Sequence, residues 1–357
     1  MPAAPIEARS GAAFAWSGRE VLIWGGANDS EYGDGAAYST AGNSWRRIAA
    51  SPLGPRMAVA SVWTGSAWFL WGGQSGVPTL SDGALYDPAA DTWTPLPASP
   101  LGARGGAVAV WNGKDVMVIG GWKDGRASIA AVDGAAYDPQ TRSWRSLPPA
   151  PGVPVHTLLD VQAVAAGTDV YVWAQWANTV PVSANSTETS VGVTALRFDS
   201  SAWQWSVVGA DEQRRGVRSP TWTGRELILP AAQDWRGGGS GPAPHDLIGR
   251  RRALDSPVWI PMAHGPVDDC SPVTAWTGAA LVAAPVACTT GNFTSGESGA
   301  PGDAAVWDPQ SNAWLSLRKA PKAGGDVVVW AGDRLIDWGG TYRAGGGTDE
   351  VGMVLRG

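Results

Sequence analysis

The stretch that decides the fold is WTGSAWFLWGG at Trp63–Gly73, followed by YDPAADTW at Tyr86–Trp93. Its first part places a Trp before a short turn and ends an apolar run in a pair of glycines. Its second part joins Tyr to Trp through an Asp-Pro turn, in which Asp can bond its own backbone and Pro presets φ. Aromatic and apolar runs between such turns predict short β-strands.

The same signature recurs at intervals of about 50 residues, the length of a four-stranded propeller blade. The copies share a Trp before the first turn, a Gly pair that ends the second strand, and a Tyr or its substitute followed by a second Trp. The turn residues are Trp16, Trp63, Trp111, Ala165, Trp222, Trp276 and Trp330; the Gly pairs begin at Gly25, Gly72, Gly120 and Gly339; the later aromatic pairs are Tyr38/Trp45, Tyr86/Trp93, Tyr137/Trp144, Phe198/Trp205 and Trp307/Trp314.

This arrangement resembles the kelch repeat family, whose blades carry the double Gly, the Tyr and the Trp in this order. Blades four and five keep the spacing of the repeat but not its Gly pair, which is replaced by Ala174-Gln175 and Ala231-Ala232. The resemblance implies an all-β, seven-bladed kelch-type propeller, with strand a lining the channel and strand d outermost. We expect one domain over residues 1–357, with blades at approximately 7–52, 53–100, 101–151, 152–210, 211–264, 265–321 and 322–357.

The last blade is expected to be incomplete. Pro5 and Ile6 match Pro52 and Leu53, so the chain begins in register with the tail of a strand d. Strand c of the last blade is predicted near Val351 to Arg356, close to the last residue given. The sequence therefore predicts a three-stranded seventh blade with an exposed edge.

Charge and composition exclude several functions. The net charge of −6 provides no basic stripe for nucleic acid, and no apolar run reaches the roughly 18 residues that span a bilayer. Residues 1–5 do not resemble a signal peptide, so the secreted location that the cysteines favour below implies a leader that is absent from this sequence. The three His residues lack a metal-ligand spacing, and no nucleophile or phosphate motif occurs, so neither cofactor nor metal is expected.

A binding site is expected where the blades differ. The b-to-c connections, approximately 27–34, 74–82, 122–133, 176–192, 233–249, 289–302 and 341–350, vary in every blade, whereas the other turns are short and alike. Aromatic planes beside amides suit a sugar ring or a protein partner. The candidates are Tyr32, Trp122, Gln175, Trp176, Asn178, Gln233, Asp234, Trp235, Tyr342 and Arg343.

A second set of candidates precedes the turn Trp by seven residues: Arg9, Arg56, Arg104 and Arg215. By propeller symmetry these side chains would gather at the channel mouth. They could hold an anion such as a carboxylate or sulfate. Alternatively, each pairs with an aspartate of the neighbouring blade, such as Asp34, Asp82 or Asp133.

Cys270 and Cys288 flank one predicted hairpin of blade six, close to opposite positions. A cross-strand disulfide would imply an oxidising compartment, and the alternative is two unpaired small residues in a blade core. The Ala, Gly and Arg richness indicates a bacterial source. We therefore expect an extracellular or cell-envelope protein.

These features favour a monomeric, non-catalytic propeller that binds carbohydrate, a small molecule or protein on its b-to-c loop face. The alternative is a small-molecule enzyme of the epimerase or lyase kind. Sialic-acid epimerases also use kelch blades, and this resemblance makes His156, beside the arginines, the candidate for proton transfer.

Overall fold

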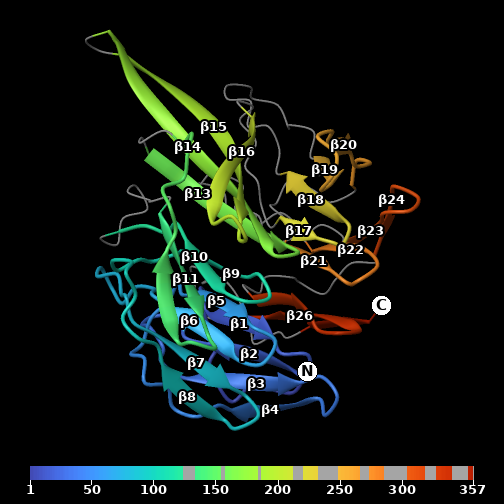
Figure 1. Ribbon diagram of the computed structural model, residues 1–357. Helices are drawn as coiled ribbons and strands as arrows, with labels where there is room; N and C mark the ends of the chain where they lie inside the picture. The colour runs from blue at the N-terminus through green and yellow to red at the C-terminus, as the bar shows by residue number, and fades with distance from the viewer. Residues whose placement is uncertain are drawn as a thin grey trace. The chain divides into compact units, whose positions relative to one another are not determined.

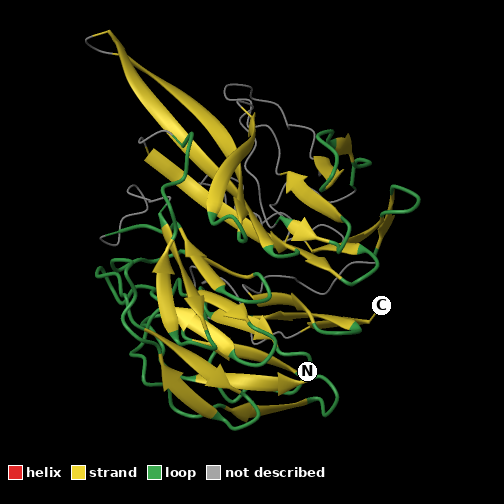
Figure 2. Ribbon diagram, viewed as in Figure 1, coloured by secondary structure: helices red, strands yellow, loops and turns green. Residues whose placement is uncertain are grey.

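The computed structural model describes residues 1–123, 133–153, 157–183, 186–211, 220–231, 248–265, 273–284, 304–317, 327–339 and 353–356. These residues form strands and connections, and the described ranges contain no helix (Figure 2). The all-β class is as predicted. The chain divides into two compact units, Pro2–Arg214 and Met1 with Arg215–Gly357, which we describe separately.

The first unit consists of four antiparallel sheets, in each of which strands adjacent in sequence are hydrogen-bonded neighbours (Figure 1). The first sheet contains β1 (Ala13–Trp16), β2 (Glu20–Trp24), β3 (Gly35–Ser39) and β4 (Ser44–Arg47), and the second contains β5 (Ala60–Trp63), β6 (Trp68–Trp71), β7 (Gly83–Asp87) and β8 (Thr92–Pro95). The third contains β9 (Val108–Trp111), β10 (Val116–Ile119), β11 (Gly134–Asp138) and β12 (Ser143–Ser146), and the fourth contains β13 (Thr157–Ala166), β14 (Asp169–Ser183), β15 (Ser186–Asp199) and β16 (Gln204–Asp211).

The second unit continues the pattern with three sheets. Two have four strands: β17 (Thr221–Trp222), β18 (Glu226–Ala231), β19 (Ile248–Ala253) and β20 (Ile260–Pro261) in one; β21 (Val273–Trp276), β22 (Leu281–Ala284), β23 (Ala305–Asp308) and β24 (Ala313–Ser316) in the other. The last has β25 (Val327–Trp330), β26 (Arg334–Trp338) and β27 (Met353–Arg356). No described strand pairs with the outer edge of β27, as the sequence predicted.

The order of strands within a blade also follows the prediction. In the first unit the first strands of successive sheets are neighbours, β1 beside β5, β5 beside β9 and β9 beside β13. In the second unit β17 lies beside β21 and β21 beside β25. Within each unit, strand a of one sheet therefore lies beside strand a of the next sheet, as in a propeller whose first strands line the channel.

The repeated aromatic residues pack one blade against the next. The Trp93 ring lies 4.8 Å from that of Tyr86 in its own blade and 6.0 Å from that of Trp24 in the preceding blade. Its Nε1 donates to the carbonyl of Ala49, also in the preceding blade, at 2.9 Å. Equivalent bonds join Trp144 to Pro97, Trp205 to Pro148 and Trp314 to Ala263.

The N-terminal segment occupies the corresponding place beside blade one. Trp45 Nε1 donates to the Pro2 carbonyl at 3.1 Å, in the way that Trp93 donates to Ala49. Ile6 is buried, as is Leu53, its match in the repeat. Residues 2–6 thus pack on blade one as the tail of a strand d would.

One connection differs from the prediction. The described residues of segment 176–192, expected to be a loop, instead continue strands β14 and β15, which Figure 1 shows extending past β13 and β16. The reason lies in the side chains: Thr179, Val180, Val182, Thr187 and Thr189 are β-branched and favour extended backbone. This run could have been read from the sequence as two strands.

Candidate functional site

In blades one to three, the arginine before strand a is buried within its own blade. Arg56 is 3% exposed, and its guanidinium donates to both carboxylate oxygens of Asp82, at 2.6 and 3.0 Å. Further bonds run from Nη1 to the Gly72 carbonyl at 3.2 Å and from Nε to the Gly54 carbonyl at 2.9 Å. The side chain thereby ties the start of strand a to the end of strand b and the start of strand c.

Blades one and three repeat this unit. Arg9 donates to Asp34 at 2.6 Å, and Arg104 donates to both oxygens of Asp133 at 2.6 Å. Each aspartate belongs to the same blade as its arginine, so the expectation of a partner in the neighbouring blade was wrong. The reason is geometric: the aspartate opens strand c of the sheet whose strand a the arginine opens.

The Gly pair explains why the unit has this shape. Gly72 donates its N–H to the Asp82 carbonyl at 2.9 Å, and Gly73 donates to the Arg104 carbonyl of the next blade at 2.8 Å. Both glycines have positive φ, +71° and +97°, and a Cβ on Gly73 would lie 2.7 Å from the Met57 carbonyl oxygen. Only glycine fits this backbone and this close approach. The pair therefore anchors the next arginine as well as its own aspartate.

This geometry decides what the arginines offer to a ligand. Arg9, Arg56 and Arg104 are 1–3% exposed, whereas the side chains of Asp34, Asp82 and Asp133 are 43–56% exposed. Each guanidinium group is buried and donates to its carboxylate, although Arg104 Nε has no hydrogen-bond partner, and the carboxylates form the accessible side of each pair. The three described pairs match the ion-pair alternative.

The pKa values of these carboxyl groups agree with that reading. Hydrogen bonds from Arg56 and Arg104 lower the pKa of Asp82 and of Asp133, against the opposing effect of burial. Burial raises the pKa of Asp34, but hydrogen bonds from Arg9 and Arg47 outweigh it, and the net shift is downward. All three are carboxylates at neutral pH.

The b-to-c loops of blades one to three are joined to each other. Glu31 Oε1 in the first loop accepts the Gly76 N–H of the second at 2.7 Å. Gln74 Oε1 in the second loop accepts Trp122 Nε1 of the third at 3.1 Å. Val77, at the tip of the second loop, is 75% exposed. The described parts of these loops form one connected surface, which we call the loop face.

Tyr32 lies on the loop face and is half-buried. Its hydroxyl donates to Glu7 Oε2 at 2.5 Å, and the Arg9 guanidinium carbon lies 3.9 Å from its ring centre. The hydrogen bond to Glu7 raises the pKa of Tyr32, with burial adding to it. One face of the ring is thus covered by Arg9.

Trp122 and Trp176 lie over glycines. A Cβ on Gly106 would lie 2.0 Å from the Trp122 ring, and a Cβ on Gly192 would lie 2.4 Å from the ring of Trp176. Trp176 Nε1 donates to Thr194 Oγ1 at 3.1 Å, and its ring packs against the core of blades three and four. Both indoles are half-buried, with part of each ring packed against a glycine, and their role in binding stays a prediction.

The remaining candidates divide into two groups. Gln175 is half-buried in β14, opposite Asp160 of β13, and Asn178 lies in the backbone of β14, its side chain not described. The other candidates lie outside the described residues: Arg215, Gln233, Asp234, Trp235, Tyr342, Arg343, His156, Cys270 and Cys288.

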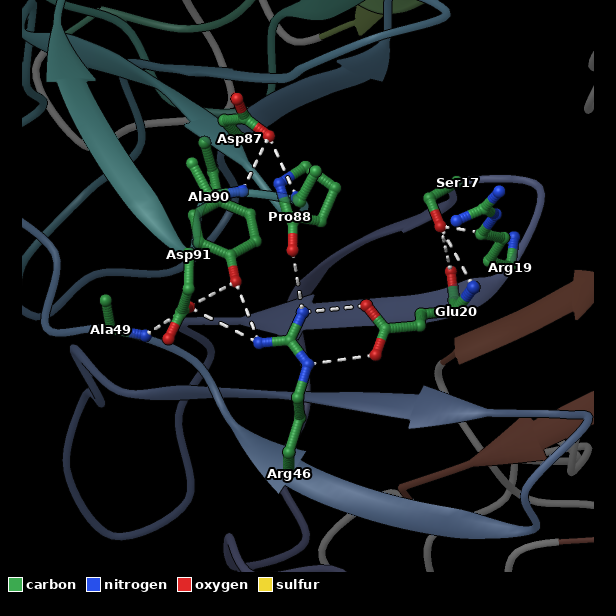
Figure 3. A network of polar contacts seen from close by, with 11 residues as sticks. Ser17, Arg19, Glu20, Arg46, Ala49, Asp87, Pro88, Ala90 and Asp91 are labelled. Atoms are coloured by element: carbon green, nitrogen blue, oxygen red, sulfur yellow. Dashed lines mark hydrogen bonds and ion pairs between the residues drawn. The ribbon is translucent and has the colours of Figure 1, made fainter.

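A polar network that the sequence analysis missed joins blades one and two at the turns remote from the loop face (Figure 3). Arg46 donates to Glu20 at 2.7 and 2.9 Å and to the Tyr86 hydroxyl of blade two at 3.1 Å. Tyr86 in turn donates to Asp91 Oδ1 at 2.6 Å, which also accepts the Ala49 N–H at 2.9 Å. Burial, followed by the hydrogen bond to Asp91, raises the pKa of Tyr86.

The network has a counterpart between blades three and four. Arg145 follows Trp144 as Arg46 follows Trp45, and its guanidinium carbon lies 3.0 Å from the ring centre of Trp203. Phe198 and Trp203 replace Tyr86 and Asp91, so a cation–π contact replaces the hydrogen bonds. An Arg follows the strand-d Trp in blades one and three, and in both places it joins its blade to the next.

The described ranges contain no group of three or more His, Cys, Asp or Glu residues that could hold a metal ion. They also contain no helix long and apolar enough to cross a membrane.

Sheets of sequential antiparallel strands, joined blade to blade through their first strands, define a β-propeller. Residues 2–174 match the family model of the KLHDC2/KLHL20/DRC7 Kelch-repeats domain. The chain is therefore a β-propeller with kelch repeats. No curated protein matches the sequence.

Proposed function

We propose that this chain is a non-catalytic recognition module that binds a protein partner on its loop face. Kelch propellers typically mediate protein interactions, and the kelch match covers the blades that carry the described part of this face. The observation that supports the proposal best is the linkage of the three loops through Glu31–Gly76 and Gln74–Trp122. A surface held in place before binding loses little entropy when a partner docks.

The chemistry of the face also suits a polypeptide. Val77 offers an exposed apolar side chain, and Asp34, Asp82 and Asp133 offer carboxylates whose positions are fixed by buried arginines. Apolar contact surrounded by fixed polar groups is typical of protein interfaces. A carbohydrate would need open aromatic planes, and the described indoles Trp122 and Trp176 each have one side against glycine.

No observation in the described ranges favours the epimerase or lyase alternative. That alternative needs a titratable group free to move a proton, together with arginines free to hold an anion. Arg9, Arg56 and Arg104 are committed to aspartates, and His156 lies outside the described residues.

We further propose an extracellular or cell-envelope location. The support is the sequence alone: Cys270 and Cys288 flank one hairpin, and both lie outside the described residues. A disulfide between them would persist only in an oxidising compartment.

A paired screen tests the ligand class. The purified chain is presented to a random-peptide display library and to a glycan array. We expect selection of peptides that share a sequence pattern and no saturable glycan binding. Enrichment of glycans without peptides, or of neither class, would contradict a protein-recognition role.

A further inference from the structure

The b-to-c hairpin of blade four projects beyond its own sheet as a two-stranded arm. Strand β13 pairs with β14 only as far as Ala177, and β16 pairs with β15 only as far as Val193. The pairing of β14 with β15 continues from there through Asn178–Ser190 to Pro181–Thr187. In the described residues, the arm therefore has two outer edges with no strand beside them (Figure 1).

The two edges are not equivalent, because β14 contains Pro181. Proline has no N–H, and inside a sheet it is accommodated where that side of the backbone faces away from the neighbouring strand. The outer edge of β14 is thus interrupted at its middle. Residues two apart face the same side, so Thr179 also directs its N–H and C=O outward.

The pairing of β14 with β15 then determines which backbone groups lie on the outer edge of β15. Thr187 and Thr189 pair with Pro181 and Thr179. These are non-hydrogen-bonded pairs, because Pro181 and Thr179 direct their N–H and C=O outward. In an antiparallel ladder, the two members of a non-hydrogen-bonded pair direct their N–H and C=O groups away from each other. Among the described residues, the outer edge of β15 therefore presents the N–H and C=O groups of Thr187, Thr189 and Val191 without interruption.

This edge lacks the usual protection against pairing. Natural edge strands are shielded by lysine, proline, bulges or short length. The sequence STETSVG at 186–192 has neither lysine nor proline, carries one charge at Glu188, and is rich in residues that favour strands.

We infer that two copies of this chain associate through the outer edges of β15, pairing antiparallel about a two-fold axis at Thr189. This register sets Thr189 opposite its own copy and Thr187 opposite Val191, using all the outward groups. Glu188 then faces Ser190, so the two carboxylates do not oppose each other, and a Thr–Thr pair is favourable across strands. Because only one edge of each arm is intact, the association closes at a dimer and does not extend into a fibre.

The test uses the full chain and a matched pair of variants. Molar mass is measured by light scattering over a concentration series from about 1 to 100 µM, the range in which small interfaces dissociate. Wild type should approach twice the monomer mass. Thr189→Pro, which removes an outward N–H from the intact edge, should remain monomeric, and Thr179→Pro, on the edge already broken by Pro181, should dimerise like wild type.

A cross-link locates the contact independently of folding effects from proline. Opposite residues of a hydrogen-bonded pair have Cα atoms about 5.5 Å apart, within disulfide range. Thr189→Cys should give a covalent dimer on mild oxidation, whereas Thr179→Cys and wild type should not. A wild-type chain that is monomeric at every concentration, or equal behaviour of the two proline variants with no Thr189→Cys dimer, overturns the inference.

Discussion

At the scale of single residues, the Gly pair and the arginine form one unit repeated along the first three blades. Gly73 donates to the Arg104 carbonyl, while the Arg104 side chain holds Asp133 and the Gly120 carbonyl of its own blade. Gly26 donates to the Arg56 carbonyl in the same way, so Arg56 and Arg104 are each fixed by two blades. The sequence predicted the glycines and the arginines separately, but their connection depends on backbone approach that no sequence pattern records.

Replacement of Gly73 by alanine should destabilise the protein by about 3 kcal/mol, because a positive φ and a contact with a carbonyl oxygen oppose the new methyl group. The matched control is Gly76→Ala, which also has a positive φ but meets no atom within 4 Å. It should cost about 1 kcal/mol. Denaturant unfolding measures both, and equal losses would show that close approach does not matter.

The lowered pKa of Asp82 predicts how the stability of the protein depends on pH. Its pKa is lowered in the folded chain, so its contribution to stability is present above the ordinary carboxyl value and is lost as pH falls through the folded value. The melting temperature of wild type should therefore fall below about pH 4. Asp82→Asn should be less stable than wild type at pH 7, and the difference should shrink on acidification. A constant difference from pH 7 to pH 3 would contradict this role.

At the scale of elements, the strands and their aromatic contacts could be predicted, because Trp, Tyr and Gly recur in step with the blade. The arm of blade four could not be predicted from that repeat, because its strands replace a connection that is short in blades one and two. The packing of the Trp122 ring against glycines could not be predicted from the sequence either. Its place in a variable loop predicts a binding role, which stays a prediction, and Gly105 and Gly106 beneath it make room for its ring.

The positions of the indoles predict graded losses of stability. Trp144→Ala removes a ring packed on Tyr137, Phe69 and Trp71, and should cost about 3 to 5 kcal/mol. Trp122→Ala removes a half-buried ring and one hydrogen bond to Gln74, and should cost about 1 to 2 kcal/mol. Chemical denaturation compares them, and no loss for Trp122→Ala would restore it as a residue free for binding.

At the scale of the whole molecule, the described residues form one sheet for each repeat, and three described strands make up the last sheet. The single domain over residues 1–357 and the extracellular location stay predictions. What a propeller recognises could not be read from its repeat, because the repeat encodes the scaffold and the connections encode the partner.

The proposed extracellular or cell-envelope location predicts that Cys270 and Cys288 form a disulfide. Thiol titration of the unfolded, unreduced chain, purified from an oxidising compartment, should detect no free thiol, since Cys270 and Cys288 should be bonded. Reduction before unfolding should release two thiols per chain and lower the melting temperature. Two free thiols in the unreduced sample would remove the support for secretion.

The most direct test of the loop face is a calorimetric titration of one selected peptide against two surface variants. Val77→Asp changes an exposed apolar residue on the loop face, and Leu315→Asp changes a similarly exposed one on β24, a strand d. We predict that Val77→Asp weakens binding at least about tenfold, as loss of an interface contact worth 1.4 kcal/mol would, and that Leu315→Asp binds like wild type. Unchanged affinity for Val77→Asp together with a loss for Leu315→Asp would place the partner elsewhere and contradict the account.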